Sequence, residues 1–493
     1  MSSPPSVRTR IAPSPTGQLH IGSLAIALRN FAYAKGRGGQ FIIRIEDTDR
    51  ERFVPGATEE TLKVLKDYGL NWDEGPDIDG PYGPYIQSQR LERYQERAQW
   101  LVDQGHAYYC ICSKEELKEM RDQQLKRKEI PKYDRRCLKN QDEVKKKIAA
   151  GNKYIIRMKI PFDENHPPEP VVFNDLVRGE ISISTDNIDD QVLLKSDGFP
   201  TYHLAVVVDD HDMRITHIIR GEEWISSTPK HIWLYQKFGW DQSEVMPQYA
   251  HVPVFLSPTG KGKMSKRHGD VSARSFLEQG YLPEAMLNFL MIMGWAPKDK
   301  NEVMNLQRFQ QEFDIRDISS KAVIFDTNKL NWLNGLYIRT LTADELFDRL
   351  QPYKPPELSD DLLKRFIPLI KDRLETLSQI GEFTQYFYQQ PELDPKAILK
   401  ESKITPQETA AYLHQVETVI SQISDSDWSV ATLETKLHDL QQQLGFKPRP
   451  AFMTIRLAVT GRSATPPLFD VLHLLGRDRC LTNLSHAQKI LQA

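Results

Sequence analysis

The first 45 residues limit the fold of this chain more than any other segment. Residues 7–12 have the composition of a short strand, a loop with Pro and Gly follows at 13–18, and apolar side chains then recur at helical spacing over 21–32. A glycine-rich turn at 36–39 ends this helix, and residues 41–45 form a second apolar strand. A strand, a helix and a strand in this order form a βαβ unit with parallel strands and a right-handed crossover. We therefore predict an α/β fold for the N-terminal region.

Length and composition indicate a globular protein of several domains. The chain has 493 residues, whereas a single hydrophobic core rarely exceeds about 300 residues. A hydrophobic content of 40% and a charged content of 27% exclude a disordered or fibrous protein. No run of about 18 apolar residues could span a membrane, and residues 1–10 lack the apolar segment of a secretory signal. Four cysteines in this length do not form a disulfide framework, so we expect reduced thiols and a cytoplasmic location.

The pattern changes twice along the chain. After two predicted helices the sequence becomes rich in short β runs, then returns to an α/β pattern, and from about residue 326 it is helical with polar faces. We predict helices at 57–68, 88–104, 228–238, 343–350, 362–377 and 432–444, β-rich runs at 154–160 and 180–185, and apolar runs of the α/β part at 204–208 and 215–219. These changes indicate an inserted domain and a helical C-terminal third.

One stretch of the chain is locally basic although the net charge is −3. Nine Lys and Arg residues lie between Lys118 and Lys139, with acidic residues among them, and Ser113 with Glu116 forms a capping box that begins a helix there. Taken alone, such a stretch fits a solvated helix face as well as a surface for a polyanion.

The loop before the first helix has the features of a phosphate site. Residues 10–22 read Arg-Ile-Ala-Pro-Ser-Pro-Thr-Gly-Gln-Leu-His-Ile-Gly, after the first strand and at the start of the first helix, where nucleotide-binding α/β folds hold their ligand. A helix N-terminus offers free N–H groups to phosphate, Gly17 and Gly22 allow a close approach, and His20 adds a donor. Alone, the pattern also fits a capping turn.

A second segment brings mobile lysines. Residues 260–267 read Gly-Lys-Gly-Lys-Met-Ser-Lys-Arg, and lysines on a flexible loop can stabilise the charge on a leaving pyrophosphate. Alone, this segment fits a solvated basic loop equally well.

Together, in this order, the two segments resemble the two signature motifs of class I aminoacyl-tRNA synthetases. The first motif reads His20-Ile21-Gly22-Ser23, with Ser where the superfamily usually has a second His, and the preceding Pro-Ser-Pro-Thr-Gly resembles the bacterial glutamyl branch. The second reads Lys263-Met264-Ser265-Lys266. The resemblance implies a Rossmann-like catalytic domain in two halves (1–85 and 200–252), an inserted α+β acceptor-binding domain (86–199), a stem-contact region with the second motif (253–337) and an all-α anticodon-binding module (338–493, in sub-bundles of about 338–385 and 386–493).

The same resemblance implies the residues that handle ATP. Lys266 would be the main lysine of the transition state, with Lys263 as a helper and His20 beside the phosphates, and Mg²⁺ would accompany ATP. The ATP-binding residues it implies are Pro13, Ser14, Thr16, Gly17, His20, Gly22, Glu223, Trp224 and Lys266.

The substrate pocket needs a cation for the side-chain carboxylate of glutamate and an anion for its amino group. Arginine pairs with a carboxylate through two hydrogen bonds, so arginine is the expected selector. By resemblance, the pocket comprises Arg10, Ser14, Glu46, Tyr202 and Arg220. Two alternatives stay open: Arg44 and Glu46 could form a structural ion pair, and Tyr202 could belong to the core. Val206 stands where some bacterial relatives have Asn, which removes one polar contact.

For tRNA, the resemblance implies contacts at both ends of the chain. Asp49 and Arg50 would touch the acceptor end, and Arg456 the anticodon. Arg373 matches an arginine that reads the third anticodon base in forms selective for tRNA-Glu, although a plain surface arginine is the alternative. The match predicts an enzyme that does not charge tRNA-Gln.

Three cysteines raise the question of zinc. Some family members bind Zn²⁺ near Cys110, Cys112 and Cys137, but the fourth position is Lys139 here, and Tyr133 would be an unusual ligand. We therefore expect no bound metal, with Zn²⁺ as the alternative.

The predicted reaction joins L-glutamate to ATP as glutamyl-adenylate and transfers the glutamyl group to the 3′-terminal adenosine of tRNA-Glu. The family generally needs tRNA for the first step. We expect a monomer. Three alternative functions remain. A small-molecule nucleotidyltransferase would have no use for the C-terminal helices. A non-catalytic RNA-binding paralogue would have lost the motifs, and a truncated tRNA-modifying relative would lack the helical module.

Overall fold

The computed structural model describes residues 6–160, 169–185, 188–242, 246–264 and 271–492. It divides into two compact units, one of residues 1–276 with 283–327 and one of residues 277–282 with 328–493.

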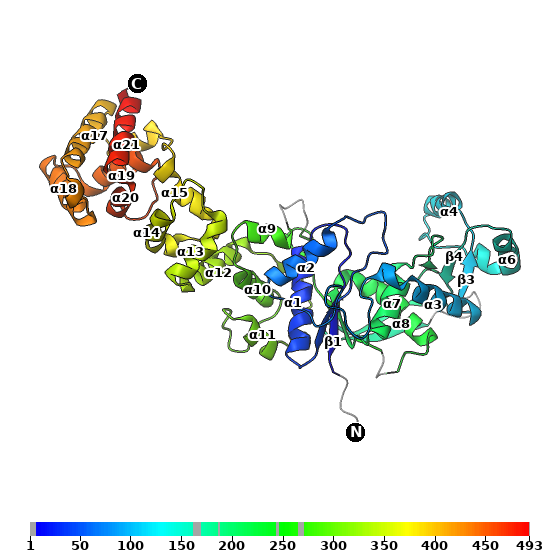
Figure 1. Ribbon diagram of the computed structural model, residues 1–493. Coiled ribbons are helices and arrows are strands. Elements are labelled where there is room, and N and C mark those ends of the chain that lie inside the picture. Colours follow the sequence, from blue (N-terminus) through cyan, green and yellow to red (C-terminus); the bar gives the residue numbers. More distant parts are fainter. Residues whose placement is uncertain (1–5, 161–168, 186–187, 243–245, 265–270, 493) are drawn as a thin grey trace. The chain divides into compact units, whose positions relative to one another are not determined.

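The N-terminal βαβ unit is confirmed. Strand β1 (Arg8–Ile11) and strand β2 (Gln40–Ile43) are parallel and in register from Arg8–Gln40 to Ile11–Ile43, and helix α1 (Ile21–Lys35) connects them (Figure 1). The apolar face of α1 is buried as predicted. This places the N-terminus of α1 after the carboxyl end of β1, where parallel sheets hold ligands.

A second set of strands adjoins β1. Strand β8 (His217–Gly221) lies next to β1, because the Thr216 N–H donates to the Arg8 carbonyl at 2.9 Å, and β9 (Gln248–Val252) is parallel to β8. A hairpin of β5 (Pro170–Asp175) and β6 (Gly179–Ser184) joins the other side of β9. Parts of the chain that are about 200 residues apart therefore form one α/β body.

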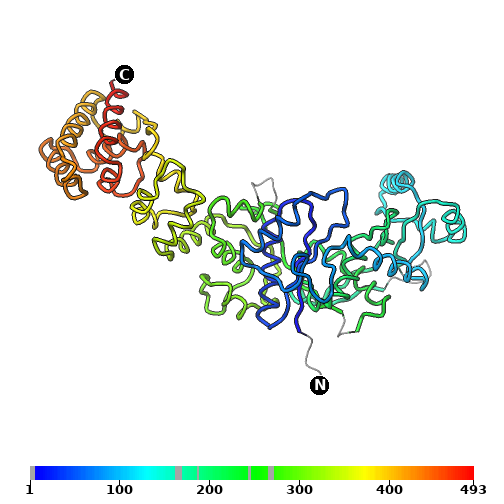
Figure 2. Tube along the Cα trace, in the orientation of Figure 1, coloured from blue at the N-terminus to red at the C-terminus, as the bar shows by residue number. Residues whose placement is uncertain are grey.

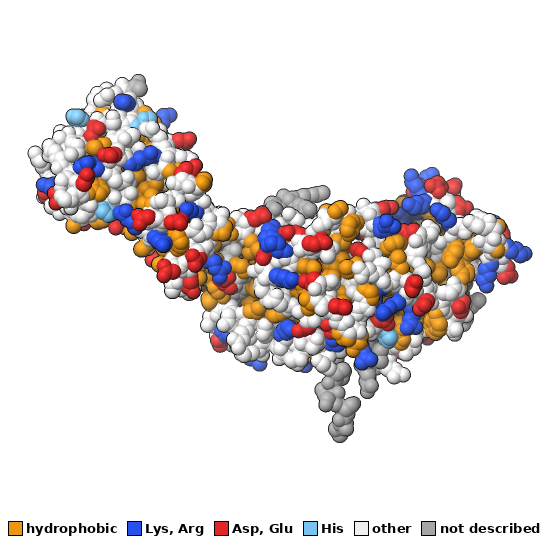
Figure 3. Space-filling view, viewed as in Figure 1, with side chains coloured by type: hydrophobic (Ala, Val, Ile, Leu, Met, Phe, Trp, Pro, Cys, Tyr) orange, Lys and Arg blue, Asp and Glu red, His pale blue; other side chains and the backbone are white. Residues whose placement is uncertain are grey.

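The segment between these halves folds on an antiparallel sheet of β3 (Ala107–Cys110), β4 (Ile155–Met158) and β7 (Val192–Leu194). Its helices are α3 (Leu91–Asp103), α4 (Lys114–Lys126), α5 (Arg136–Lys139) and α6 (Gln141–Ala149). The capping box predicted at Ser113 and Glu116 is present, and α4 has no buried residue. Lys and Arg side chains gather over α4, with acidic side chains among them (Figure 3).

Helix α2 (Ala57–Asp67) confirms the helix predicted at 57–68, and α8 (Thr228–Lys237) confirms the helix predicted at 228–238. The apolar run 204–208 is helical, within α7 (Tyr202–Asp212), and all five of its residues are buried. The remaining elements of this unit are α9 (Ala273–Glu278), α10 (Pro283–Ile292), α11 (Leu306–Glu312) and a short parallel pair, β10 (Phe255–Leu256) and β11 (Val323–Ile324).

From α12 onward every described element is helical, as the trace from yellow to red shows (Figure 2). The α-helices are α12 (Thr327–Thr340), α13 (Ala343–Leu350), α14 (Asp360–Ile370), α15 (Ile380–Tyr388), α16 (Pro395–Ser402), α17 (Pro406–Ser421), α18 (Val430–Gln443), α19 (Pro448–Thr460), α20 (Leu468–Leu475) and α21 (Arg477–Gln492). A core that includes Leu413, Ile455 and Leu484 joins α17, α19 and α21.

One predicted helix in this unit is too long. The helix predicted at 362–377 ends at Ile370 and is followed by short 3₁₀ turns. Pro368 lies near its end and has no N–H to donate to the preceding turn, which weakens the helix there.

Among the described residues, no helix is long and apolar enough to cross a membrane.

Candidate active site

A cavity of about 1330 Å³ lies in the first unit and collects most of the predicted site residues. Those that line it are Arg10, Pro13, Ser14, His20, Gly22, Glu46, Asp49, Arg50, Tyr202, Arg220, Glu223, Trp224 and Lys263. Thr16 and Gly17 belong to the same loop but do not line the cavity. Gly17 has a φ of +144°, a conformation that strains any residue with a side chain.

The two motifs meet at this cavity. Lys266 itself lies outside the described residues, but Lys263 and Met264, just before it in the second motif, line the cavity. Beyond the motif, Ser272 forms a β-bridge with His20, and the Ile21 N–H donates to the Val271 carbonyl at 2.9 Å. Residues 271 and 272 therefore lie against the first motif, while Lys263 and Met264 share its cavity.

His20 caps helix α1 and presents a donor. Its Nδ1 accepts the backbone N–H of Gly22 at 2.9 Å, so Nδ1 is unprotonated and the proton of the neutral ring is on Nε2. A Cβ at residue 22 would lie 3.1 Å from this Nδ1, so a side chain there would push against the imidazole. The first turn of α1 has no acidic residue. The positive end of the helix dipole and an imidazole donor together suit a phosphate group.

Arg10 reaches the cavity from β1 with one edge of its guanidinium already paired. Its Nε and Nη2 donate to the two carboxylate oxygens of Asp210 at 3.0 and 3.2 Å. Burial alone would lower the pKa of Arg10, but Asp210 raises it above the ordinary value, so the charge is secure. Among the described residues, Nη1 of Arg10 has no hydrogen-bond partner.

Glu46 lines the cavity and also forms the ion pair that the sequence left as an alternative. Arg44, which is fully buried, donates to Glu46 Oε1 at 3.0 Å and to Asp210 Oδ1 at 2.7 Å. Burial raises the pKa of Glu46, and Arg44 and Arg10 offset part of that rise. The carboxylate of Glu46 therefore has a structural partner on one side and the cavity on the other.

Arg220 differs from Arg10, because protein groups use all five of its N–H bonds. Nε donates to His251, and Nη1 to the hydroxyl of Tyr202 and to His231. Nη2 donates to the Trp224 carbonyl and the Thr228 hydroxyl. Since His251 Nε2 accepts from Arg220, its Nδ1 carries the proton and donates to Asp175 on β5 at 2.7 Å.

Aromatic and charged side chains form the wall beside Arg220. Tyr202 lines the cavity and lies against Trp224, with ring centroids 4.3 Å apart, so it is more than a core residue. Glu223 pairs with Lys263 at 3.1 Å. Val206 is buried in α7 and does not line the cavity.

Asp49 and Arg50, the predicted contacts of the tRNA acceptor end, line the same cavity. Asp49 pairs with Arg52 at 2.6 Å, and this hydrogen-bonded pair lowers the pKa of Asp49. The guanidinium of Arg50 lies over the ring of Phe199 at 5.4 Å.

In the helical unit, Arg373 is exposed and Arg456 is half-buried. Arg456 donates to the Pro466 carbonyl at 2.8 Å and also bonds Thr465. Burial lowers the pKa of Arg456, and the charge of Arg373 lowers it further, so these two arginines, far apart in the sequence, lie near each other.

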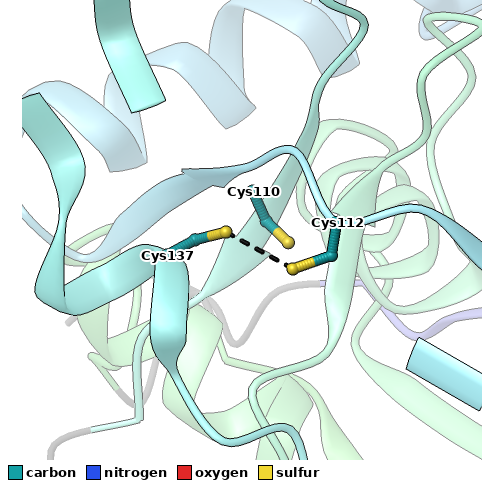
Figure 4. A group of neighbouring side chains, drawn as sticks. All are labelled: Cys110, Cys112 and Cys137. Carbon is teal, nitrogen blue, oxygen red and sulfur yellow. Dashed lines mark hydrogen bonds between the residues drawn. The ribbon is translucent and has the colours of Figure 1, made fainter. Parts of the chain in front are cut away.

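The three cysteines form a cluster in the inserted segment, shown in Figure 4. Their sulfur atoms lie within 4.8 Å of one another, with Cys112 and Cys137 3.5 Å apart. The hydroxyl of Tyr133 lies 3.3 Å from Cys110 Sγ and 3.4 Å from Cys112 Sγ. Three sulfurs and one phenol oxygen make four donors, which is the number that a tetrahedral site requires.

Three features of this site have no signal in the sequence. Asp210 holds Arg10, and His251 with Thr228 holds Arg220; none carries a motif that would single it out. Arg29, on α1, lines the cavity with no carboxylate within ion-pair distance among the described residues, and burial lowers its pKa to about 10.

Comparisons with known proteins agree with this architecture. Residues 6–332 match the family described as tRNA synthetases class I (E and Q), catalytic domain, and residues 345–488 match the anticodon binding domain. The chain is 43% identical to a glutamate–tRNA ligase of Dehalococcoides mccartyi, with 98% of this chain and 97% of the relative covered, and 43% identical to one of Acinetobacter baumannii, with 99% and 94% covered. A crystal structure of a glutamate tRNA ligase from Elizabethkingia meningosepticum in complex with its amino acid has a TM-score of 0.84 at 33% identity and covers 99% of this chain and 100% of that one.

The fold and the cavity define a nucleotide-binding α/β enzyme with a helical C-terminal unit. The chain belongs to the class I tRNA synthetases of the E and Q family. Membership implies ATP, an amino acid and tRNA as its partners.

Proposed function

We propose that this enzyme is a glutamate–tRNA ligase, which activates L-glutamate with ATP to glutamyl-adenylate and transfers the glutamyl group to the 3′-terminal adenosine of tRNA-Glu. The observation that carries the proposal is the shared cavity, because His20 of the first motif and Lys263 of the second line it together with Arg10 and Glu46. Relatives named glutamate–tRNA ligase at 43% identity over nearly the whole chain support this substrate.

The activation step needs positioning and charge rather than a covalent intermediate. The carboxylate of glutamate attacks the α-phosphate of ATP, and pyrophosphate leaves with the negative charge that lysines and helix N–H groups can stabilise. We assign the phosphates to His20 and the N-terminus of α1, the leaving group to Lys263 and Lys266, and the adenosine side to Glu223 and Trp224. Mg²⁺ would bind with the ATP phosphates.

The amino acid would lie between opposite charges. We assign its carboxylate groups to Arg10 and Arg220 and its amino group to Glu46, with Ser14 and Tyr202 beside them. The open edge of Arg10 suits a carboxylate that accepts two hydrogen bonds.

The tRNA would contact both units. We assign the acceptor end to residues 86–199 together with Asp49 and Arg50, and the anticodon to residues 338–493. The excess of nine Lys and Arg residues over four Asp and Glu residues at 118–139 supports the first assignment, because RNA ends are bound mainly through phosphates and shape. The proximity of Arg373 and Arg456 supports the second.

One experiment tests the proposed function: charging of purified tRNA-Glu and tRNA-Gln with labelled glutamate. We expect charging of tRNA-Glu alone, and ATP–pyrophosphate exchange only when tRNA-Glu is present. Exchange that proceeds at full rate without RNA would favour a small-molecule nucleotidyltransferase, and no exchange under any condition would favour a non-catalytic RNA-binding protein.

A substitution at Arg373 tests the predicted selectivity. Because a bidentate arginine contact to a base is worth about 1–3 kcal/mol of discrimination, Arg373→Gln should reduce the preference for tRNA-Glu over tRNA-Gln by about 5- to 150-fold. The matched control is Arg365→Gln, an exposed arginine of α14 with a weak ion pair to Asp361 at 3.9 Å. An unchanged ratio of kcat/KM for the two tRNAs in the Arg373 variant would make it a plain surface residue.

The cysteine cluster fits two states. Reduced thiols without metal agree with the lack of a fourth Cys or His ligand beside Cys110, Cys112 and Cys137. Alternatively, Cys110, Cys112, Cys137 and Tyr133 would hold a structural Zn²⁺, which would stabilise the inserted segment and supply no chemistry to the reaction. Metal analysis of the purified chain distinguishes the two states, with one zinc per chain in the second state.

We propose that the enzyme acts as a cytoplasmic monomer.

A further inference from the structure

A chain of four alternating charges connects two walls of the cavity. It runs from Glu46 through Arg44 and Asp210 to Arg10, with contacts of 3.0, 2.7 and 3.0 Å. Glu46 and Arg10, at the ends, line the cavity, whereas Arg44 and Asp210, in the middle, do not. The side chains of Arg44 and Asp210 are 0% and 1% exposed, so solvent does not screen them.

The pairing at Arg10 leaves a defined edge for a ligand. A guanidinium has two edges that can each bind a carboxylate through two hydrogen bonds, one formed by Nε and Nη2 and one by Nη1 and Nη2. Asp210 occupies the first edge, at 3.0 and 3.2 Å. This fixes the plane of the guanidinium and leaves the second edge for a second carboxylate.

Asp210 serves both arginines at once. Its Oδ1 accepts from Arg10 Nε and from Arg44 Nη1. Burial alone would raise the pKa of Asp210, but the two arginines hold it below the ordinary value, so the carboxylate stays charged. Arg44 in turn holds Glu46, so a shift of Asp210 moves both ends of the chain of charges.

We infer that Asp210 is a positioning residue, which sets the orientation of Arg10 and, through Arg44, the distance between Arg10 and Glu46. This distance selects amino acids by the separation of their amino group and their side-chain carboxylate. The inference rests on the proposed function, because it takes Arg10 and Glu46 as the groups that hold the two charges of glutamate. Aspartate, one methylene shorter, cannot reach both groups when their spacing is fixed.

Asp210→Asn tests this directly. The amide of asparagine has one oxygen and one NH₂ group, and the NH₂ group would face an N–H of Arg10, which is also a donor. The paired edge of Arg10 is then lost and its guanidinium turns. Because small misplacements of binding groups have large effects on catalysis, we expect KM for glutamate to rise about 50-fold, KM for ATP to change less than about 2-fold, and the preference for glutamate over aspartate to fall about 10-fold.

Asp209→Asn is the matched control. Asp209 is the adjacent residue on α7 and is fully buried, and it accepts hydrogen bonds from Gln87, Arg90 and Tyr94, none of which lines the cavity. Its carboxylate also lies 3.6 Å from Arg44 Nε, a longer contact than the 2.7 Å between Arg44 and Asp210. We expect this variant to lose as much thermal stability as Asp210→Asn while both KM values stay within about 2-fold of the wild type.

Two further variants keep the test decisive. Asp210→Glu retains the buried charge if the amide variant does not fold, and it should raise KM for glutamate about 10-fold because its carboxylate is displaced. Because Asp210 acts in large part through Arg10, the double variant Arg10→Lys with Asp210→Asn should raise KM for glutamate by clearly less than the product of the two single effects.

Three results would overturn the inference: an unchanged KM for glutamate in folded Asp210→Asn or Asp210→Glu, an equal rise in Asp209→Asn, or additive effects in the double variant. The proposed function would fail differently, since the wild type itself would then not charge tRNA with glutamate.

Discussion

Arg10→Ala is expected to lower kcat/KM for glutamate about 1000-fold. The change removes the open guanidinium edge at the cavity, and two charge-assisted hydrogen bonds of about 1.5–3 kcal/mol each correspond to a loss of roughly 10²- to 10⁴-fold. Steady-state charging of tRNA-Glu over a range of glutamate concentrations measures the effect, which should lie mainly in KM for glutamate.

Arg8→Ala is the control for Arg10. Arg8 lies on the same strand and pairs through two hydrogen bonds with Glu74, at 2.7 and 3.0 Å, but does not line the cavity. It should lose stability and keep its KM for glutamate. Near-normal glutamate use by Arg10→Ala would refute the assigned pocket.

His20→Ala is expected to slow adenylate formation about 100- to 1000-fold, as the loss of one donor aimed at transition-state charge does in other enzymes. The variant removes both the Nε2 donor and the cap that Nδ1 gives to α1. Single-turnover formation of glutamyl-adenylate with saturating tRNA-Glu measures the rate, and KM for ATP should change less.

His20→Asn separates these two roles. Asparagine is a good N-cap, so the helix start is retained, but its side chain does not reach the position of Nε2. We expect wild-type thermal stability with nearly the full loss of rate. A variant as fast as the wild type would show that the histidine only caps the helix.

Local signals explain which parts of the fold the sequence predicts. The βαβ unit and the capping box at Ser113 and Glu116 depend on residues close together in the chain, and both are present. Residues 204–208 have no such signal, because five apolar residues fit a buried strand or a buried helix equally well. Residues distant in the sequence stabilise helix α7, because Arg10, Arg44 and Arg90 neutralise its two buried aspartates, Asp209 and Asp210.

The same limit applies to the site. The two motifs predict His20 and Lys263 as site residues, and both line the cavity. Asp210 and His251 have no motif of their own, and their importance follows only from which arginine each one contacts. Residues that act through another residue are therefore the ones that a single sequence conceals.

Arg10 and Arg220 will respond to an arriving carboxylate in opposite ways. At Arg10 the ligand meets a bare edge, so docking is a simple addition. At Arg220 every N–H already has a protein acceptor, so docking there is an exchange in which Tyr202, His231 or the Trp224 carbonyl must release its bond. One end of the pocket is thus ready before the substrate enters, while the other is completed by the substrate itself.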